Sequence, residues 1–218
     1  ALQAAHFAEF GFSPSSYVPP HLVKFCSIPH MQMLHGLVLK KHHEMSQSPE
    51  MIQLKESIRV KVESLLHTSG IISTNVPLVV FGSSRNNFGS KGSDLDMCLG
   101  NTVTEGEDSE KGQLIIAIGE LLEKSGGYEV QSVRSTARIP IVHFKDLEHD
   151  IECDIAYSNT LAVQNTEMLR LYSTLDERIQ PLGHFIKYWA KARNINNPGE
   201  GTLSSYGWIL LLIHFLQV

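Results

Sequence analysis

Small polar and acidic residues gather in the stretch FGSSRNNFGSKGSDLDMCL, residues 81–99. Gly82 and Ser83 end a β-rich run, and Asp94 and Asp96 follow after ten intervening residues. Side chains alternate along a strand, so Asp94 and Asp96 are expected on one face. Two neighbouring carboxylates repel each other unless a cation lies between them. Oxygen ligands of this kind suit Mg²⁺ or Mn²⁺, and Mg²⁺ often completes its shell with substrate phosphates.

A second metal ion needs a third carboxylate, and the later run DIECDIAY, residues 150–157, offers three. Asp150, Glu152 and Asp154 alternate on one predicted face, and their spacing does not choose among them. A lone Asp-x-Asp is more often a solvated sheet face, because short motifs occur by chance. The Gly-Ser pair before the motif makes a nucleotide site the better interpretation.

The elements that carry these residues have the pattern of an α+β module with a mixed or antiparallel sheet. One helix, at about 109–124, interrupts the strands. The predicted strands are VPLVVF (76–81), DLDMCL (94–99), YEVQSV (128–133), IPIVHF (139–144) and DIECDIAY (150–157).

Helical periodicity flanks this module on both sides. Ser48 is a good N-cap and Pro49 suits a first helical turn. The later apolar faces need partners, which the earlier helices are expected to supply. The predicted helices are 31–45, 48–67, 166–174, 176–193 and 203–218. The predicted organisation is a lead-in (1–29), N-terminal helices (30–70), the β-rich module (71–157) and a helical domain (158–218) that continues beyond Val218. The β-rich module is thus inserted between the N-terminal helices and the helical domain.

Composition excludes several classes of protein. The 218 residues are 42% hydrophobic, enough for a folded core, and the net charge of −5 disfavours duplex binding by bulk charge. Three cysteines without CxxC spacing indicate neither a disulfide framework nor a zinc site, which favours a reducing, cytoplasmic setting. The longest apolar run, 207–213, is far shorter than a membrane helix, so no membrane partner is expected.

Taken together, Gly-Ser, ten residues, Asp-x-Asp and a later strand Asp resemble the polymerase-β-like nucleotidyltransferase superfamily. Within it, the chain is similar to the terminal uridylyltransferases and the cytoplasmic, germline-type poly(A) polymerases. The stretches LAVQNTEMLRLYSTLDERIQPLGHFIKYWAKARNIN and GTLSSYGWILLLIHFLQ carry the resemblance into the helical half. The resemblance implies a nucleotidyltransferase palm inserted in a discontinuous helical central domain.

The resemblance also implies the roles of individual residues. The metal-binding, catalytic carboxylates would be Asp94, Asp96 and Asp154. Gly82 and Ser83 would contact the triphosphate, Asn165 the ribose hydroxyls, and Ala162 and Thr166 would lie at the sugar. The remaining nucleotide contacts would be Lys187 and Lys191 at the triphosphate, helped by Ser205, and Tyr206 stacked on the base.

Four of these residues also have a simpler structural interpretation. Lys187 and Lys191 are spaced i,i+4, which places both on one helix face, but a solvated basic stripe is as common. Asn165 can bond a ribose diol, and before a helix it could equally be a cap. Tyr206 offers a stacking surface, although an aromatic residue at a helix start more often joins the core.

The implied reaction is template-independent addition of nucleotides to an RNA 3′ end with Mg²⁺ or Mn²⁺ and release of pyrophosphate. The residues 81–99 resemble the uridylyltransferases more than the mitochondrial poly(A) polymerases, so UTP is favoured over ATP. Poly(A) polymerase activity and an inactive RNA-binding paralogue remain the alternatives. The resemblance places the base-selecting segment beyond Val218, and RNA targeting would depend on a partner or on domains outside the sequence.

Overall fold

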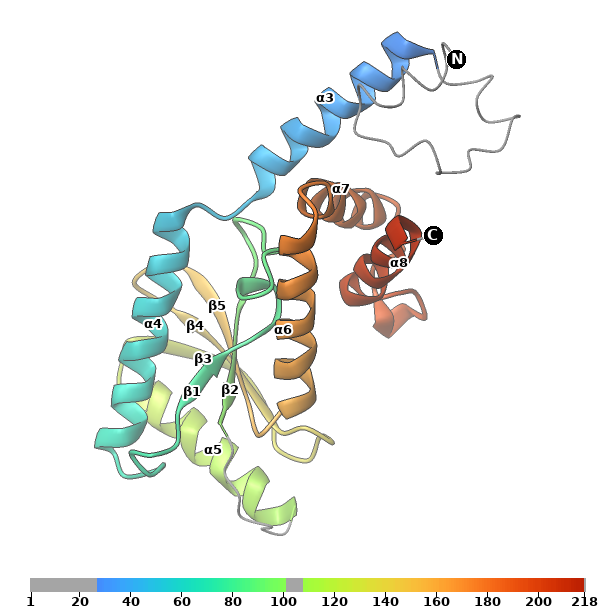
Figure 1. Ribbon diagram of the computed structural model, residues 1–218. Coiled ribbons are helices and arrows are strands. Elements are labelled where there is room, and N and C mark those ends of the chain that lie inside the picture. Colours follow the sequence, from blue (N-terminus) through green and yellow to red (C-terminus); the bar gives the residue numbers. More distant parts are fainter. Residues whose placement is uncertain (1–26, 101–107, 218) are drawn as a thin grey trace. The chain divides into compact units, whose positions relative to one another are not determined.

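The computed structural model describes residues 27–100 and 108–217, which form two compact units (Figure 1). One unit is Met45–Gln180, and the other combines the described residues before and after it. The α+β unit is therefore inserted in a discontinuous helical unit, as the sequence predicted. Its two junctions fall at 44/45 and 180/181, whereas the sequence placed them at 70/71 and 157/158. The predicted lead-in, 1–29, lies almost wholly outside the described residues.

A five-stranded mixed sheet forms the centre of the Met45–Gln180 unit, in the order β1-β2-β5-β4-β3. β2 and β5 run parallel, and every other neighbouring pair is antiparallel. Each strand starts and ends within two residues of its predicted limits. The strands are β1 (Leu78–Val80), β2 (Leu95–Leu99), β3 (Tyr128–Arg134), β4 (Ile141–Asp146) and β5 (Ile151–Ala156).

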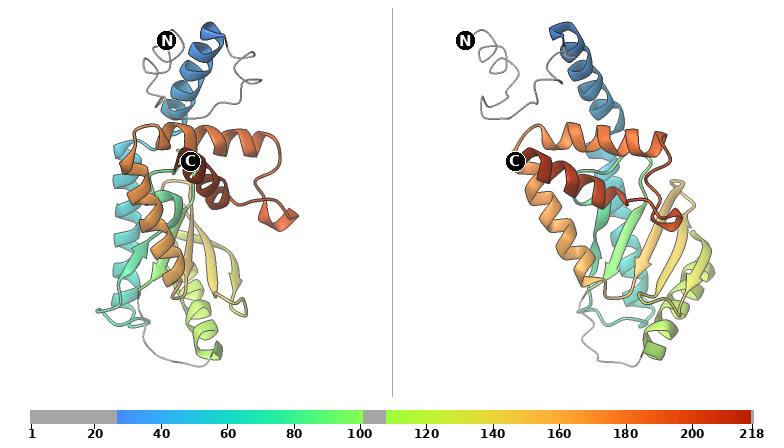
Figure 2. Two further views of the ribbon diagram at one scale, coloured as in Figure 1. Left: turned by 45° about the vertical axis from the view of Figure 1, so that its right-hand side comes forward. Right: turned by 90° about the vertical axis from the view of Figure 1, so that its right-hand side faces the viewer.

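Two helices cover one face of this sheet, and a third lies along the other (Figure 2). The helices α4 (Pro49–Thr68) and α5 (Asp108–Lys124) pack against the face that carries Leu95, Met97 and Leu99. These three residues are fully buried. The opposite face, towards α6 (Thr160–Leu175), carries the side chains that alternate with these three, among them Asp96. The core and the predicted site residue therefore lie on opposite faces of β2.

The partner of α4 differs from the sequence prediction. Ile58, Val62 and Leu66 form an apolar stripe on α4, and they belong to the core against the sheet, whereas the sequence predicted that the earlier helices pack against the later ones. The start of α4 is as predicted, because Ser48 accepts a hydrogen bond from the N–H of Met51 and Pro49 occupies the first turn. An amphipathic stripe defines a face without defining what covers it.

The second unit is helical and comprises α3 (Ile28–Met45), most of α7 (Ile179–Ala192) and α8 (Ser205–Gln217). Polar and aromatic contacts connect its helices. Nδ1 of His42 lies 3.1 Å from Nδ1 of His184, and the Lys41 ammonium lies over the ring of Tyr188. Within the described ranges, no helix is both long and apolar enough to span a membrane.

Candidate active site

Two carboxylates are adjacent at the centre of the sheet. Asp96 on β2 and Asp154 on β5 are register partners in the parallel pair. Their side chains therefore project from the same face of neighbouring strands, which lie about 4.8 Å apart. Asp94 comes just before β2, which begins at Leu95, and its side chain is exposed. The structure thus brings the three predicted aspartates to one end of the β2–β5 pair.

Neither of the other two candidates for the third carboxylate lies opposite Asp96. Asp150 precedes β5 in a left-handed conformation (φ 60°) and forms an ion pair with Lys145 at 2.5 Å. Glu152 is the register partner of Lys145 on β4. Both acids thus have a basic neighbour away from β2, and only Asp154 pairs in register with Asp96.

His143 contacts Asp154 from the other side. The two residues are register partners on β4 and β5, with Nδ1 of the imidazole 2.5 Å from Oδ1 of the carboxylate. Nε2 of His143 is buried and has no hydrogen-bond partner in the described part of the chain. His143 is not among the residues predicted from the sequence, although its place among apolar residues in IPIVHF, on a predicted strand, is an available signal.

The surroundings of Asp154 disfavour its ionised form, so a nearby cation would stabilise that form. Burial raises the pKa of Asp154, the neighbouring His143 opposes this rise, and the charge of Asp94 adds to it, so the pKa lies above its ordinary value. A desolvated carboxylate with a like charge nearby is stabilised in its ionised form by a bound cation.

The oxygen-only donors fit the chemistry of Mg²⁺ or Mn²⁺. In the conformations of the described chain, however, no three Asp, Glu, His or Cys side chains form a group ready to hold a metal ion. Oδ1 of Asp154 faces His143. A metal ion held by Asp94, Asp96 and Asp154 would therefore have to draw these carboxylates together.

Gly82 brings its backbone directly against the carboxylates. It begins the 3₁₀ turn η1 (Gly82–Ser84) with φ 69°, a conformation that favours glycine. A Cβ atom at this position would overlap the carboxylate of Asp96. The Gly82 N–H donates to Oγ1 of Thr166 at 2.8 Å, which joins the turn to α6. Gly82 therefore lies beside Asp96, one of the predicted metal ligands, and Ser83 follows it in the turn. Their contact with a triphosphate stays a prediction.

The helix α6 presents the sugar-site candidates of this unit. It begins at Thr160, six residues earlier than predicted, because the Asn159 side chain caps it by accepting from the N–H of Ala162. Asn165 consequently lies inside the helix, and its interpretation as an N-cap is wrong. Thr166 is buried, and its hydroxyl donates to the carbonyl of Ala162 while accepting from Gly82.

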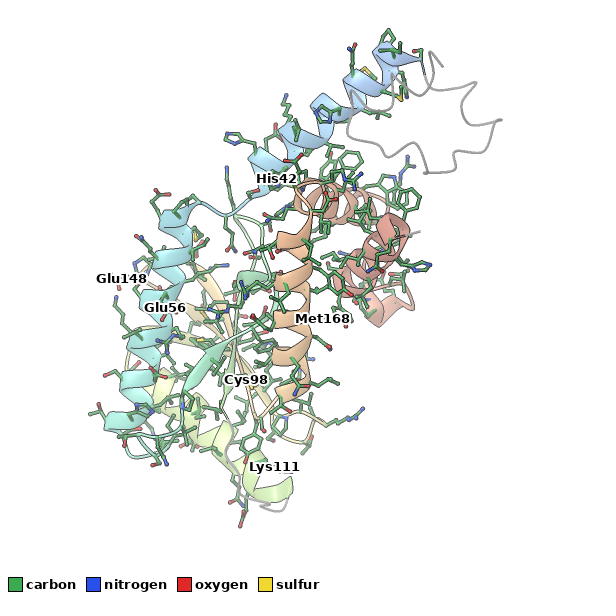
Figure 3. The ribbon with its side chains drawn as sticks, viewed as in Figure 1. His42, Glu56, Cys98, Lys111, Glu148 and Met168 are labelled. Atoms are coloured by element: carbon green, nitrogen blue, oxygen red, sulfur yellow. The ribbon has the colours of Figure 1, made fainter. Side chains whose placement is uncertain are left out.

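The start of α6 is fixed to the sheet. The N–H of Asn159 lies 2.9 Å from Sγ of Cys98 on β2, on the face that also carries Asp96. In Figure 3, Cys98 lies in the sheet and Met168 on α6. Cys98 and Cys153, the cysteines of the described ranges, are both buried and carry free thiols.

The four remaining candidates lie in the helical unit. Lys187 and Lys191 are one turn apart on α7. Ser205 is the first residue of α8, and its hydroxyl bonds the Asn196 side chain at 2.9 Å. Tyr206 follows it and is 36% exposed. Within their own unit, two of these residues lie on α7 and two on α8, and their contacts with the nucleotide stay predictions.

Lys55 on α4 is a second site residue that was not predicted from the sequence. It is only 3% exposed and donates to Ser84, Ser93 and the carbonyl of Asp94. Burial lowers its pKa, whereas the charges of Asp96 and Asp94 act in the opposite direction. The sequence feature that could have identified Lys55 is its charge at a position one turn before Ile58, within the apolar stripe.

Comparisons with known proteins agree with this geometry. The family model of the mitochondrial-like poly(A) RNA polymerase central palm domain matches residues 34–174. Terminal uridylyltransferase 4 of Mus musculus is 40% identical over 143 residues, which cover 64% of this chain and 9% of that protein. Poly(A) RNA polymerase gld-2 of Caenorhabditis elegans is 34% identical over 215 residues, covering 95% of this chain and 18% of that protein.

Solved structures give the same answer for the fold. The structure of the GLD-2/RNP-8 complex superposes with a TM-score of 0.78 at 30% identity, covering 86% of this chain and 56% of that one. The fold is a polymerase-β-like nucleotidyltransferase palm with helical additions. The chain belongs to the family of terminal RNA nucleotidyltransferases that contains terminal uridylyltransferases and poly(A) RNA polymerases. It spans less than a fifth of the length of the two curated relatives named above.

Proposed function

We propose that this chain is the catalytic part of an enzyme that adds nucleoside monophosphates to RNA 3′ ends without a template. One observation carries the proposal: Asp96 and Asp154 are register partners on parallel strands, with the Gly82 backbone against Asp96. This arrangement supports a site in which carboxylates and a phosphate-binding turn meet. Family membership supports the reaction class.

The proposed reaction is in-line attack of the RNA 3′-hydroxyl on the α-phosphorus of a nucleoside triphosphate. A new phosphodiester bond forms, the bond to the β-phosphate oxygen breaks, and pyrophosphate leaves. We propose Asp154 as the base that accepts the hydroxyl proton, with a metal-bound hydroxide as the alternative; the raised pKa of Asp154 and its contact with His143 support this role. Divalent metal ions on Asp94, Asp96 and Asp154 would supply further acidification of the hydroxyl and charge neutralisation.

The other contacts keep the roles that the resemblance implied. Gly82 and Ser83 contact the triphosphate, and Lys187 and Lys191 offset the charge of the leaving pyrophosphate. Asn165 binds the ribose, Tyr206 stacks on the base, and Ser205 assists at the phosphates. Thr166 acts at the sugar edge while its hydroxyl holds Gly82, and Ala162 lies beside it.

We propose uridylate as the nucleotide added, with ATP as the alternative substrate. The resemblance of residues 81–99 to uridylyltransferases favours UTP, whereas relatives of both kinds match the chain. The presence of all three aspartates disfavours an inactive RNA-binding paralogue. Two buried free cysteines support a reducing, cytoplasmic setting. RNA targeting would depend on a protein partner or on a domain outside the sequence, and the solved complex of the similar GLD-2 with RNP-8 supports the first of these.

The test is a single incubation of the full chain with a labelled short RNA, Mg²⁺, and UTP or ATP at equal concentration. We expect the RNA to lengthen, faster with UTP, and Asp96→Ala to stop lengthening while the variant keeps wild-type circular dichroism. Faster extension with ATP would replace the uridylylation proposal by polyadenylation. Full activity of Asp96→Ala would refute the proposed site.

A further inference from the structure

Lys55 occupies a position where a charge is costly. It lies one turn before Ile58 on the stripe of α4 that faces the core, beside Glu56, which Figure 3 labels on that helix. Only 3% of Lys55 is exposed, so its ammonium has lost its water shell. Burial of an ammonium group is strongly unfavourable unless its donors are satisfied. The ammonium of Lys55 must therefore be stabilised by hydrogen-bond acceptors inside the protein.

The acceptors of the ammonium lie on one segment, which runs from Ser84, the last residue of η1, to Asp94, just before β2. Nζ of Lys55 lies 2.9 Å from Oγ of Ser84, 2.6 Å from the carbonyl of Ser93, 3.1 Å from Oγ of Ser93 and 3.3 Å from the carbonyl of Asp94. These four acceptors are hydroxyl and carbonyl oxygens and include no carboxylate. None of these hydrogen bonds pairs the ammonium with a carboxylate. The positive charge of Lys55 instead interacts with the negative charges of Asp94 and Asp96 over a longer distance.

The same atoms are cross-linked to one another. Oγ of Ser84 also donates to the carbonyl of Asp94 at 2.9 Å, and Oγ of Ser93 donates to the carbonyl of Ser90 at 2.9 Å. Gln47 donates to both Ser90 and Ser93. Lys55 is therefore the centre of a network that closes the loop on itself and ties it to α4.

This network joins the two halves of the candidate site. Ser84 ends the turn that starts at Gly82, and Asp94 is the first of the three aspartates. Between them the chain is rich in Gly, Ser and Asn, a composition that does not fix a loop by itself. Catalysis by positioned groups requires errors well below 1 Å, which a loop reaches only with supporting contacts.

We propose that Lys55 is a positioning residue: its buried ammonium sets the place of Asp94 and Asp96 relative to the Gly82–Ser84 turn, and contributes positive charge beneath them. Stability alone does not require this charge, because Met, whose unbranched side chain is of similar length, would fill that position without the desolvation of an ammonium group. The inference rests on the proposed function for its catalytic consequence, but not for its effects on the loop or on metal binding.

The experiment uses the full chain with Lys55→Met, and Lys61→Met as the matched control on the same helix. Lys61 forms an exposed ion pair with Glu148 and lies outside the site. We expect Lys55→Met to lower kcat for nucleotide addition about 10- to 100-fold with little change in KM for RNA. Mn²⁺ affinity, measured by electron paramagnetic resonance without substrate, should fall about tenfold, and amide exchange of residues 84–94 should accelerate.

Lys61→Met should stay within about twofold of the wild type in all three measurements. A folded Lys55→Met with wild-type kcat, Mn²⁺ affinity and amide exchange would overturn the inference, because a purely structural lysine would change only the melting temperature. If Lys55→Met does not fold, Ser84→Ala replaces it, with an expected loss of about threefold or more in Mn²⁺ affinity. Wild-type behaviour of a folded Ser84→Ala would then overturn the inference.

Failure of the proposed function has a separate signature. A wild-type chain that adds no nucleotide to any RNA refutes the proposed function. In that case Mn²⁺ affinity and amide exchange still decide the role of Lys55, because neither measurement depends on turnover.

Discussion

His143 and Asp154 are register partners on β4 and β5, and the imidazole Nδ1 contacts the carboxylate Oδ1. The other ring nitrogen of His143 is enclosed by the protein. The imidazole is thus held in place while one edge of it meets the carboxylate that we assign to the third metal-ligand position. A partner of this kind orients a ligating carboxylate and sets its basicity.

Replacing His143 should therefore change catalysis more than stability. We expect His143→Leu to lower kcat about 10- to 100-fold, since Asp154 loses the imidazole that contacts it. His143→Asn, whose amide can still reach the carboxylate, should recover part of this loss. The measurement is single-turnover extension of a labelled RNA at saturating nucleotide.

The matched control for His143 is a second His–Asp pair in the same unit. Nδ1 of His149 lies 2.7 Å from Oδ2 of Asp146, the residue at which β4 ends. We expect His149→Leu to leave kcat within about twofold of the wild type, because Asp146 is not among the proposed metal ligands. Equal losses in both variants would indicate a general effect on the sheet and contradict a specific role of His143.

The second prediction distinguishes the three acids of the run 150–157. Removal of Asp154 should lower the rate about a thousandfold or more, because a metal-ligand carboxylate supports several kcal/mol of transition-state stabilisation. Glu152→Ala and Asp150→Ala should retain activity within about threefold, because both acids have Lys145 as their neighbour. RNA extension assays on the three purified variants decide the question, and an inactive Glu152→Ala with an active Asp154→Ala would reverse the assignment.

The fold could be predicted from the sequence where periodicity and caps agree. The strands that carry Asp96 and Asp154 have alternating patterns, and the predicted limits of both lie within one residue of those observed. The start of α4 followed from Ser48 and Pro49. These are local signals, because each residue involved lies within or directly beside the element that it specifies.

The features that could not be predicted depend on contacts between distant segments. The partner of α4 could not be inferred from its stripe, since a sheet and a helix bundle offer similar apolar surfaces. The predicted start of α6 is too late, because Asn159 was not recognised as its cap. His143 and Lys55 act on aspartates 11 and 39 residues away, and only the register and the loop reveal those contacts.

The third prediction concerns the close approach of Gly82 to Asp96. In Gly82→Ala the new Cβ would overlap the Asp96 carboxylate, and the positive φ would be strained for alanine. We expect kcat/KM for the nucleotide to fall at least about tenfold because the site geometry is displaced. This loss is equivalent to about 1.4 kcal/mol of transition-state stabilisation. Steady-state kinetics with UTP and ATP measure this loss.

Gly92→Ala is the control, because Gly92 lies in the same loop and a Cβ added there would meet no atom within 4 Å. Its activity should be that of the wild type within about twofold. A loss in Gly92→Ala as large as that in Gly82→Ala would point to loop flexibility instead of steric overlap.

The fourth prediction concerns pH and the edge strand β1. Glu63 on α4 accepts the N–H of Leu78 at 2.8 Å, and its other oxygen lies 2.8 Å from Arg59, which donates to the carbonyl of Leu78 at 3.1 Å. These two side chains therefore form hydrogen bonds with the backbone N–H and carbonyl of Leu78 on the open edge of the sheet. Burial raises the pKa of Glu63, but the Leu78 N–H and the Arg59 guanidinium outweigh it, and the pKa is lowered overall.

The direction of the pH effect follows from this lowered pKa. A carboxyl whose pKa is lower in the folded than in the unfolded state contributes stability above its unfolded pKa, about 4.3, and loses it as pH falls through the folded value. Glu63→Gln can still accept from Leu78 but cannot pair with Arg59. We expect it to lower the free energy of unfolding by about 1 kcal/mol at pH 7.

Urea denaturation of the wild type and Glu63→Gln at about pH 7 and about pH 3 measures this difference. It should shrink towards zero at the lower pH, where Glu63 of the wild type becomes protonated and the two side chains are equally neutral. Glu148→Gln, in the exposed pair with Lys61, is the control and should change the free energy of unfolding less at neutral pH. An unchanged difference between the wild type and Glu63→Gln at both pH values would show that the charge of Glu63 does not stabilise the edge of β1.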